Sequence, residues 1–190
     1  MQRVFKAHGL ELFDVEELPS HGGSLRIFAQ HTGGPHPVTA RVEELLERER
    51  GAGYDGLDVY LDFPERVEAS KRALLRFLID AKEAGKRVVA YGAPGKGNTL
   101  LNYCGVRTDL IEYAVDRNPY KHGRSTPGTH IPIHPPERLE QDDPDYVLIL
   151  PWNLAREIAA QLSPLTARGV KLAVPIPKLT LLEEPEAVQR

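Results

Sequence analysis

Four short apolar stretches in the second half of the chain alternate with helix-like segments and with turns rich in glycine and proline. The expected strands cover residues 87–91, 111–115, 146–150 and 171–174. The expected helices between them cover residues 97–103 and 153–162. Parallel strands that are buried on both faces have nearly continuous apolar sequences, and helices connect them. The pattern predicts an α/β fold, a Rossmann-like and mostly parallel sheet with helices on both faces.

The first part of the chain has a different pattern. Two short extended stretches flank the turn at residues 19–23, which predicts a β-hairpin over residues 1–31. Residues 32–37 contain two glycines and two prolines and are expected to form a linker. Apolar residues at helical spacing then predict helices over residues 38–50 and 64–85. The expected organisation is therefore a hairpin, a linker and a sheet domain over residues 38–190.

Charge and cysteine content exclude several classes of function. With 24 basic and 27 acidic residues the formal net charge is −3, so no general basic field attracts nucleic acid or an anionic membrane. Cys104 is the single cysteine, which excludes an internal disulfide and a cysteine-based metal site, and no histidine spacing suggests another metal site. No stretch has the length and apolar character of a membrane span or a secretory signal. We expect a soluble, cytoplasmic protein.

The turn at residues 92–98 is the strongest candidate for anion binding. It lies where a strand ends and a helix begins, and it contains Gly92, Gly95, Lys96, Gly97 and Asn98. Free backbone N–H groups at a helix start, together with a lysine, suit a phosphate group. The glycine spacing matches neither the dinucleotide motif nor the phosphate loop of ATPases. The alternative is that Gly97 only allows the helix to approach the strand.

Further candidates follow the next strands. Asp116 lies roughly 20 residues after the loop, the offset at which an acidic residue contacts a ribose hydroxyl. Its alternative role is to cap the following turn. Asn118 and Lys121 belong to a basic loop that either suits a diphosphate or is only a solvated loop. Trp152 offers a surface for stacking on a base or sugar, and Asn153 offers a ligand contact or a helix cap. Carboxyl ends of parallel strands meet at one edge, so these side chains should lie close together.

Nucleophilic catalysis has no support in the sequence. No Gly-x-Ser-x-Gly turn is present, and Cys104 lies in a helical segment without an evident base. His21 stands beside two glycines in the hairpin turn. Such a turn either presents the histidine to a neighbouring active site or is only a surface turn.

Four motifs in order resemble one family. They read YGAPGKGNTLLNYCG, VDRNPYK, PGTHIPI and LILPWN, at residues 91–105, 115–121, 127–133 and 148–153. Together they resemble the C-terminal domain of sugar C-methyltransferases over about residues 38–180. The resemblance implies an S-adenosylmethionine-dependent parent enzyme that methylates a ring carbon of a nucleotide-linked keto-deoxysugar. Members are built from a zinc-binding domain, a cofactor-binding domain and this Rossmann-like domain.

The resemblance also implies what these 190 residues lack. Residues 1–31 resemble the end of the preceding methyltransferase domain, and the family's cofactor loop, zinc cysteines and Tyr-x-Glu-His stretch have no counterpart here. We therefore expect neither S-adenosylmethionine nor zinc to bind, and we expect the chain alone to be inactive. Its implied partners are the nucleotide-linked sugar and the upstream methyltransferase domain. Two alternatives remain open: a non-catalytic interaction module and an independent nucleotide-binding module.

Overall fold

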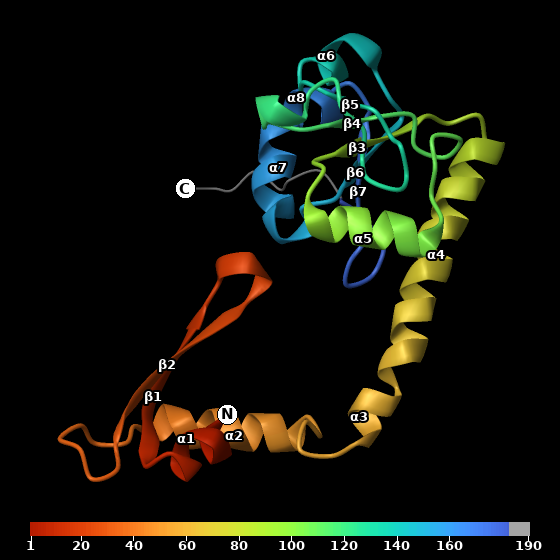
Figure 1. Ribbon diagram of the computed structural model, residues 1–190. Helices are drawn as coiled ribbons and strands as arrows, with labels where there is room; N and C mark the ends of the chain where they lie inside the picture. Colours follow the sequence, from red (N-terminus) through yellow and green to blue (C-terminus); the bar gives the residue numbers. More distant parts are fainter. Residues whose placement is uncertain (183–190) are drawn as a thin grey trace. The chain divides into compact units, whose positions relative to one another are not determined.

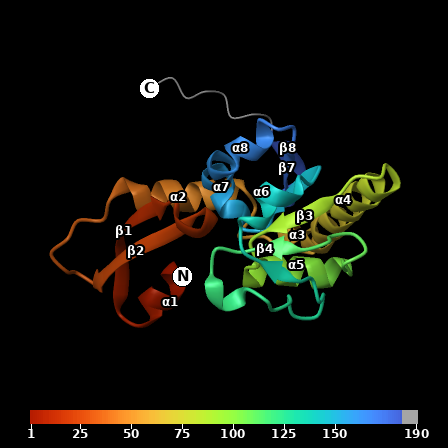
Figure 2. The ribbon, with the colours of Figure 1, turned by 90° about the horizontal axis from the view of Figure 1, so that it is seen from above.

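The computed structural model describes residues 1–182, with the exception of the His21 side chain. The chain divides into two compact units after Pro64 (Figures 1 and 2). Each unit has its own elements and its own buried residues. The division differs from the expected boundary at residues 32–37, because residues 38–64 belong with the hairpin.

The first unit is an antiparallel hairpin with helices beside it. Its elements are α1 (Gln2–Ala7), β1 (Leu10–Leu18), η1 (Ser20–Gly22), β2 (Ser24–His31), α2 (Ala40–Gly51) and α3 (Asp58–Leu61). Strands β1 and β2 pair from Leu10 with His31 to Leu18 with Ser24. The expected hairpin is therefore present, with a short helical turn at its tip.

Contacts with β1 explain why α2 belongs to the hairpin unit. The Thr39 hydroxyl donates to a carboxylate oxygen of Asp14 at 2.6 Å, and Arg41 forms an ion pair with the same carboxylate. The expected linker is also held in place. The His36 ring stacks on Phe13 with 4.7 Å between ring centroids. His36, at the end of the expected linker, therefore packs against the hairpin.

The second unit is a six-stranded sheet. Its strands are β3 (Val88–Tyr91), β4 (Ala114–Val115), β5 (Ile133–His134), β6 (Tyr146–Ile149), β7 (Lys171–Val174) and β8 (Thr180–Leu182). They lie in the order β5-β4-β3-β6-β7-β8, and all neighbours are parallel except β7 and β8. Its helices are α4 (Phe63–Glu83), α5 (Gly95–Cys104), α6 (Arg138–Asp142), α7 (Ala155–Gln161) and α8 (Ser163–Thr166), with short 3-10 helices η2 (Pro119–Lys121) and η3 (Trp152–Leu154).

Helices cover both faces of this sheet, and strand β3 shows the alternation that results. Val88 and Ala90 pack against α4 and α5, whereas Val89 and Tyr91 pack against α6, α7 and α8. Successive side chains of a strand point to opposite faces, so both sides of β3 lie in apolar cores. The expected Rossmann-like α/β fold is confirmed.

The strand order places a crevice between β3 and β6. Strands β4 and β5 follow β3 on one side, while β6 and β7 continue on the other side, so the order reverses at the β3–β6 pair. Open α/β sheets bind ligands outside the carboxyl ends of the strands at such a reversal. The loops that follow β3, β4 and β6 therefore lie where this fold binds ligands. Within residues 1–182, no helix combines the length and the apolar character needed to cross a membrane.

Candidate functional site

Two glycines bring the loop after β3 into close contact with the end of β6. Gly92 has a φ of +82°, and a Cβ atom there would lie 2.5 Å from Cγ of Pro151. At Gly97 a Cβ atom would lie 2.9 Å from Cβ of Leu150. Both distances are shorter than real carbon contacts, so the backbone approach requires glycine at each position. The start of α5 thereby lies against the crevice between β3 and β6.

Lys96 meets two residues that follow β6. Its Nζ atom lies 4.5 Å from the centroid of the Trp152 ring and donates a hydrogen bond to Oδ1 of Asn153. Burial lowers the pKa of the Lys96 ammonium from its ordinary value. Trp152 and Asn153 also line a cavity of about 610 Å³ beside the carboxyl end of β7. The structure thus brings together three predicted site residues from two strand ends, beside a cavity.

The N-terminus of α5 has backbone N–H groups without a capping side chain. Its N-cap residue is Pro94, which makes no side-chain capping bond, and a Cβ atom at the exposed Gly95 would meet no other atom within 4 Å. The first N–H groups of a helix have no partner inside the helix. Oδ1 of Asn98 is buried and accepts no hydrogen bond from any described residue. The first N–H groups of α5 and the Lys96 ammonium are donors at this loop, whereas Oδ1 of Asn98 is an acceptor.

The Asp116 side chain is hydrogen-bonded to other residues of the same chain. The residue is 8% exposed, and its carboxylate accepts hydrogen bonds from the backbone N–H groups of Ala93 and Asn118, each at 2.8 Å. Nζ of Lys121 completes the set at 2.7 Å. The Asn118 side chain in turn accepts from the N–H group of Tyr120. Asp116, Asn118 and Lys121 therefore fix the loop after β4 against the loop after β3.

This arrangement bears on the S-adenosylmethionine that the resemblance implies for the parent enzyme. Nucleotide cofactor sites in this fold class use a strand-end carboxylate to bind ribose hydroxyls, and Asp116 already accepts three hydrogen bonds from its own chain. The residues around the loop therefore do not fit that cofactor. Among residues 1–182, no three His, Cys, Asp or Glu side chains gather in a way that could hold a metal ion. The side chain of His21 lies outside the described residues.

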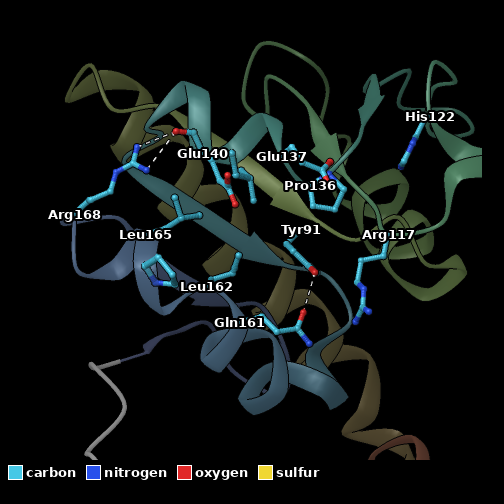
Figure 3. A pocket seen from close by; sticks show the side chains of 12 residues that line it. Tyr91, Arg117, His122, Pro136, Glu137, Glu140, Gln161, Leu162, Leu165 and Arg168 are labelled. Atoms are coloured by element: carbon cyan, nitrogen blue, oxygen red, sulfur yellow. Dashed lines mark hydrogen bonds between the residues drawn. The ribbon is translucent and has the colours of Figure 1, made fainter.

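A larger pocket lies on the α6, α7 and α8 face of the sheet, and no sequence pattern predicts it. Its volume is about 810 Å³ (Figure 3). Its lining includes Tyr91 at the end of β3, Arg117 after β4 and Gln161 at the end of α7. Burial raises the pKa of the Tyr91 phenol. The alternation along β3 is the signal that could have pointed to this pocket, because Tyr91 faces away from the α5 side.

Comparisons with known proteins identify relatives of the chain. Residues 19–177 match the family model described as the C-methyltransferase C-terminal domain. The chain is 39% identical over 178 residues to the C-methyltransferase NovU of Streptomyces niveus, and this match covers 92% of the chain and 42% of that protein. The chain thus spans less than half the length of this curated relative.

The family match includes residues of both units. A crystal structure of UDP-D-quinovosamine 4-dehydrogenase from Vibrio fischeri superimposes with a TM-score of 0.39 and 20% identity, covering 52% of this chain and 93% of that chain. The matched residues 19–177 include β2, α2 and the parallel strands of the sheet. The family match thus begins within the hairpin, ahead of the linker expected at residues 32–37. The chain belongs to the family of C-methyltransferase C-terminal domains.

Proposed function

We propose that this chain is the substrate-binding domain of an S-adenosylmethionine-dependent C-methyltransferase that acts on a nucleotide-linked deoxysugar. The observation that carries the proposal is the junction of Lys96, Trp152 and Asn153 at the reversal of strand order. A lysine beside unpaired helix N–H groups suits a diphosphate, and the neighbouring cavity has room for a sugar. The relative NovU is itself a C-methyltransferase.

The described residues would bind and orient the substrate. The ammonium of Lys96 and the first N–H groups of α5 would hold the diphosphate, which carries the charge of a nucleotide-linked sugar. Trp152 and Asn153 would contact the part of the ligand that enters the 610 Å³ cavity. S-adenosylmethionine supplies the methyl group in such enzymes when it is bound. We propose that its site and the catalytic base belong to an upstream methyltransferase domain, so that these residues alone are inactive.

Several apolar side chains suit contact with such a partner domain. Tyr54, Leu57, Tyr60 and Leu61 lie close together in the sequence and are 55–68% exposed. Exposed apolar residues gathered in one segment are typical of interaction surfaces. We propose that this segment of the first unit packs against the upstream domain.

Titration calorimetry with thymidine diphosphate and a thymidine diphosphate-linked deoxysugar tests the proposal. Lys96→Met should weaken binding of the diphosphate about tenfold or more, because it removes a charge-assisted hydrogen bond. Lys82→Met, on the exposed side of α4, is the matched control and should leave the affinity unchanged. A folded wild-type chain that binds no nucleotide would contradict the proposal. An unchanged affinity of Lys96→Met would remove Lys96 from the site.

A further inference from the structure

The pocket lies on the sheet face that α6, α7 and α8 cover. Its two ends carry different polar side chains, and an apolar floor lies between them. Figure 3 places Tyr91, Gln161 and Arg117 at one end and Arg168 with Glu140 at the other. The floor between them is formed by leucine and proline side chains, namely Pro136, Leu139, Leu162, Pro164 and Leu165. Its volume, about 810 Å³, is within the range of small-molecule sites, roughly 300–1,000 Å³.

The Arg168 guanidinium at the far end of the pocket is bonded within the protein. Both terminal nitrogens of Arg168 donate to the carbonyl oxygen of Glu140 at 3.3 Å, and Arg168 also forms an ion pair with Asp143. The Arg168 cation is thus neutralised within the protein. A charged ligand group is therefore expected at the other end.

A chain of hydrogen bonds fixes what Tyr91 can offer to a ligand. The amide nitrogen of Gln161 donates to the Glu157 carboxylate at 3.0 Å, which leaves the amide oxygen of Gln161 to accept from the Tyr91 hydroxyl at 3.3 Å. An ionised carboxylate only accepts hydrogen bonds, so the direction of this chain is set. The Tyr91 oxygen then presents its free lone pairs to the pocket. The ligand should bring an N–H or O–H donor.

Arg117 supplies an uncompensated positive charge at the same end. No hydrogen bond or ion pair joins its guanidinium to another of the residues 1–182. It follows Asp116, whose carboxylate accepts a hydrogen bond from the Asn118 N–H group, and its own side chain is exposed. His122, also in the lining, is occupied, since its Nε2 atom lies 2.7 Å from the Asp116 carbonyl oxygen. A guanidinium matches two oxygens of a phosphate group at once.

We propose that this pocket receives the nucleoside phosphate end of the nucleotide-linked sugar. The base would lie on the apolar floor, an N–H or O–H group of the nucleoside would donate to Tyr91, and Arg117 would pair with the phosphate next to it. Tyr91 directly precedes Gly92, so the pocket begins where the anion-binding loop begins. Both places lie at the carboxyl end of β3. This assignment rests on the proposed function and makes Tyr91 and Arg117 binding residues.

Variants of the full chain test the assignment by titration calorimetry with thymidine diphosphate and uridine diphosphate. Arg117→Ala should weaken binding about tenfold or more, and Tyr91→Phe about three- to tenfold, since each removes one contact to the ligand. Arg76→Ala on α4 and Tyr103→Phe on α5 are matched controls on the opposite side of the sheet, and their affinities should stay within about twofold of wild type. Circular dichroism melting curves establish that each variant is folded.

The outcomes separate this assignment from the proposed function. If the wild type binds nucleotide and both Arg117→Ala and Tyr91→Phe bind equally well, the assignment of the pocket is overturned while substrate binding elsewhere stands. If the folded wild type binds no nucleotide, the proposed function fails, and this assignment fails with it. Loss of affinity in both pocket variants, with unchanged controls, supports the assignment.

Discussion

The carboxylate of Asp116 is bound entirely by groups of its own chain, which changes how a strand-end acid should be interpreted. The sequence position predicts a ribose contact, and the alternative role was to cap the turn that follows. The structure joins Asp116 to Ala93 on one loop and to Asn118 and Lys121 on another. A buried carboxylate with three donors has little capacity left for a ligand. Asp116 would affect ligand binding by positioning the two loops that it holds together.

Replacement of Asp116 should therefore change the pH dependence of stability. Burial raises its pKa, but hydrogen bonds from Lys121, Ala93 and Asn118 outweigh burial and hold the pKa below the ordinary value of about 3.9. A carboxyl group with a lowered pKa in the folded state stabilises the protein above the unfolded pKa. That stabilisation is lost as the pH falls through the folded pKa. Asp116→Asn should lower the free energy of unfolding by about 1–3 kcal/mol at pH 7.

Urea denaturation between pH 2.5 and pH 7 measures this effect. The difference between wild type and Asp116→Asn should shrink below a pH of about 4, because the wild-type carboxyl group is then protonated as well. Asp80→Asn, on the exposed side of α4, is the matched control and should follow the wild type. A constant difference across the whole pH range would show that the ion pair is not the cause.

At the scale of secondary structure, the stability of the loop and helix after β3 depends on the size of single residues. Gly92→Ala should lower the free energy of unfolding by about 2 kcal/mol or more, since its positive φ and Pro151 both oppose a side chain. Gly97→Ala should cost about 1–3 kcal/mol through its contact with Leu150. Gly95→Ala is the control, since nothing lies near it, and it should be neutral or stabilising by up to about 1 kcal/mol.

Chemical denaturation of the three glycine variants gives these values directly. Equal effects at the three positions would mean that general helix propensity, and not contact with the end of β6, governs this loop. A selective loss at Gly92 and Gly97 would support close packing as the reason for the glycine pattern. That pattern would then be explained without a dinucleotide-type phosphate motif.

The elements that the sequence predicts well are those with strong local signals. The apolar stretch at residues 171–174 is strand β7 as expected, and residues 146–150 contain β6. The strand expected over residues 111–115 is reduced to Ala114–Val115. Strand β5 is only Ile133–His134 and is flanked by prolines, so it has no run long enough to reveal an alternation. Its pairing with β4 is a tertiary effect that local sequence does not encode.

The candidate site likewise has one part that the sequence predicts and one part that it does not. The meeting of Lys96 with Trp152 and Asn153 follows from a general rule, because carboxyl ends of parallel strands share an edge. The pocket with Tyr91, Arg117 and Gln161 does not follow from such a rule. Its lining comes from separate loops and helices, and no spacing in the sequence links them. Only the packing of α6, α7 and α8 on the sheet brings these side chains to one place.

At the scale of the whole molecule, the two units should fold separately. Both apolar cores of the sheet unit use residues between Leu74 and Val174, and none of these residues belongs to the first unit. A chain that starts at residue 63 should therefore keep the sheet unit folded, with a melting temperature within about 3 °C of the corresponding transition in the full chain. Differential scanning calorimetry of both chains measures this. A shortened chain without a cooperative transition would contradict the independence of the units.

Strand β3 has a consequence for the evolution of this family. Tyr91 faces one core and its pocket, while Gly92 begins the loop on the other side, so neighbouring positions serve different surfaces. Deleting a single residue from β3 would exchange the two sides and misplace both surfaces at once. Exchange of one aliphatic residue for another within the strand would leave both surfaces in place. Natural variants should therefore drift in the composition of this strand while its length stays constant.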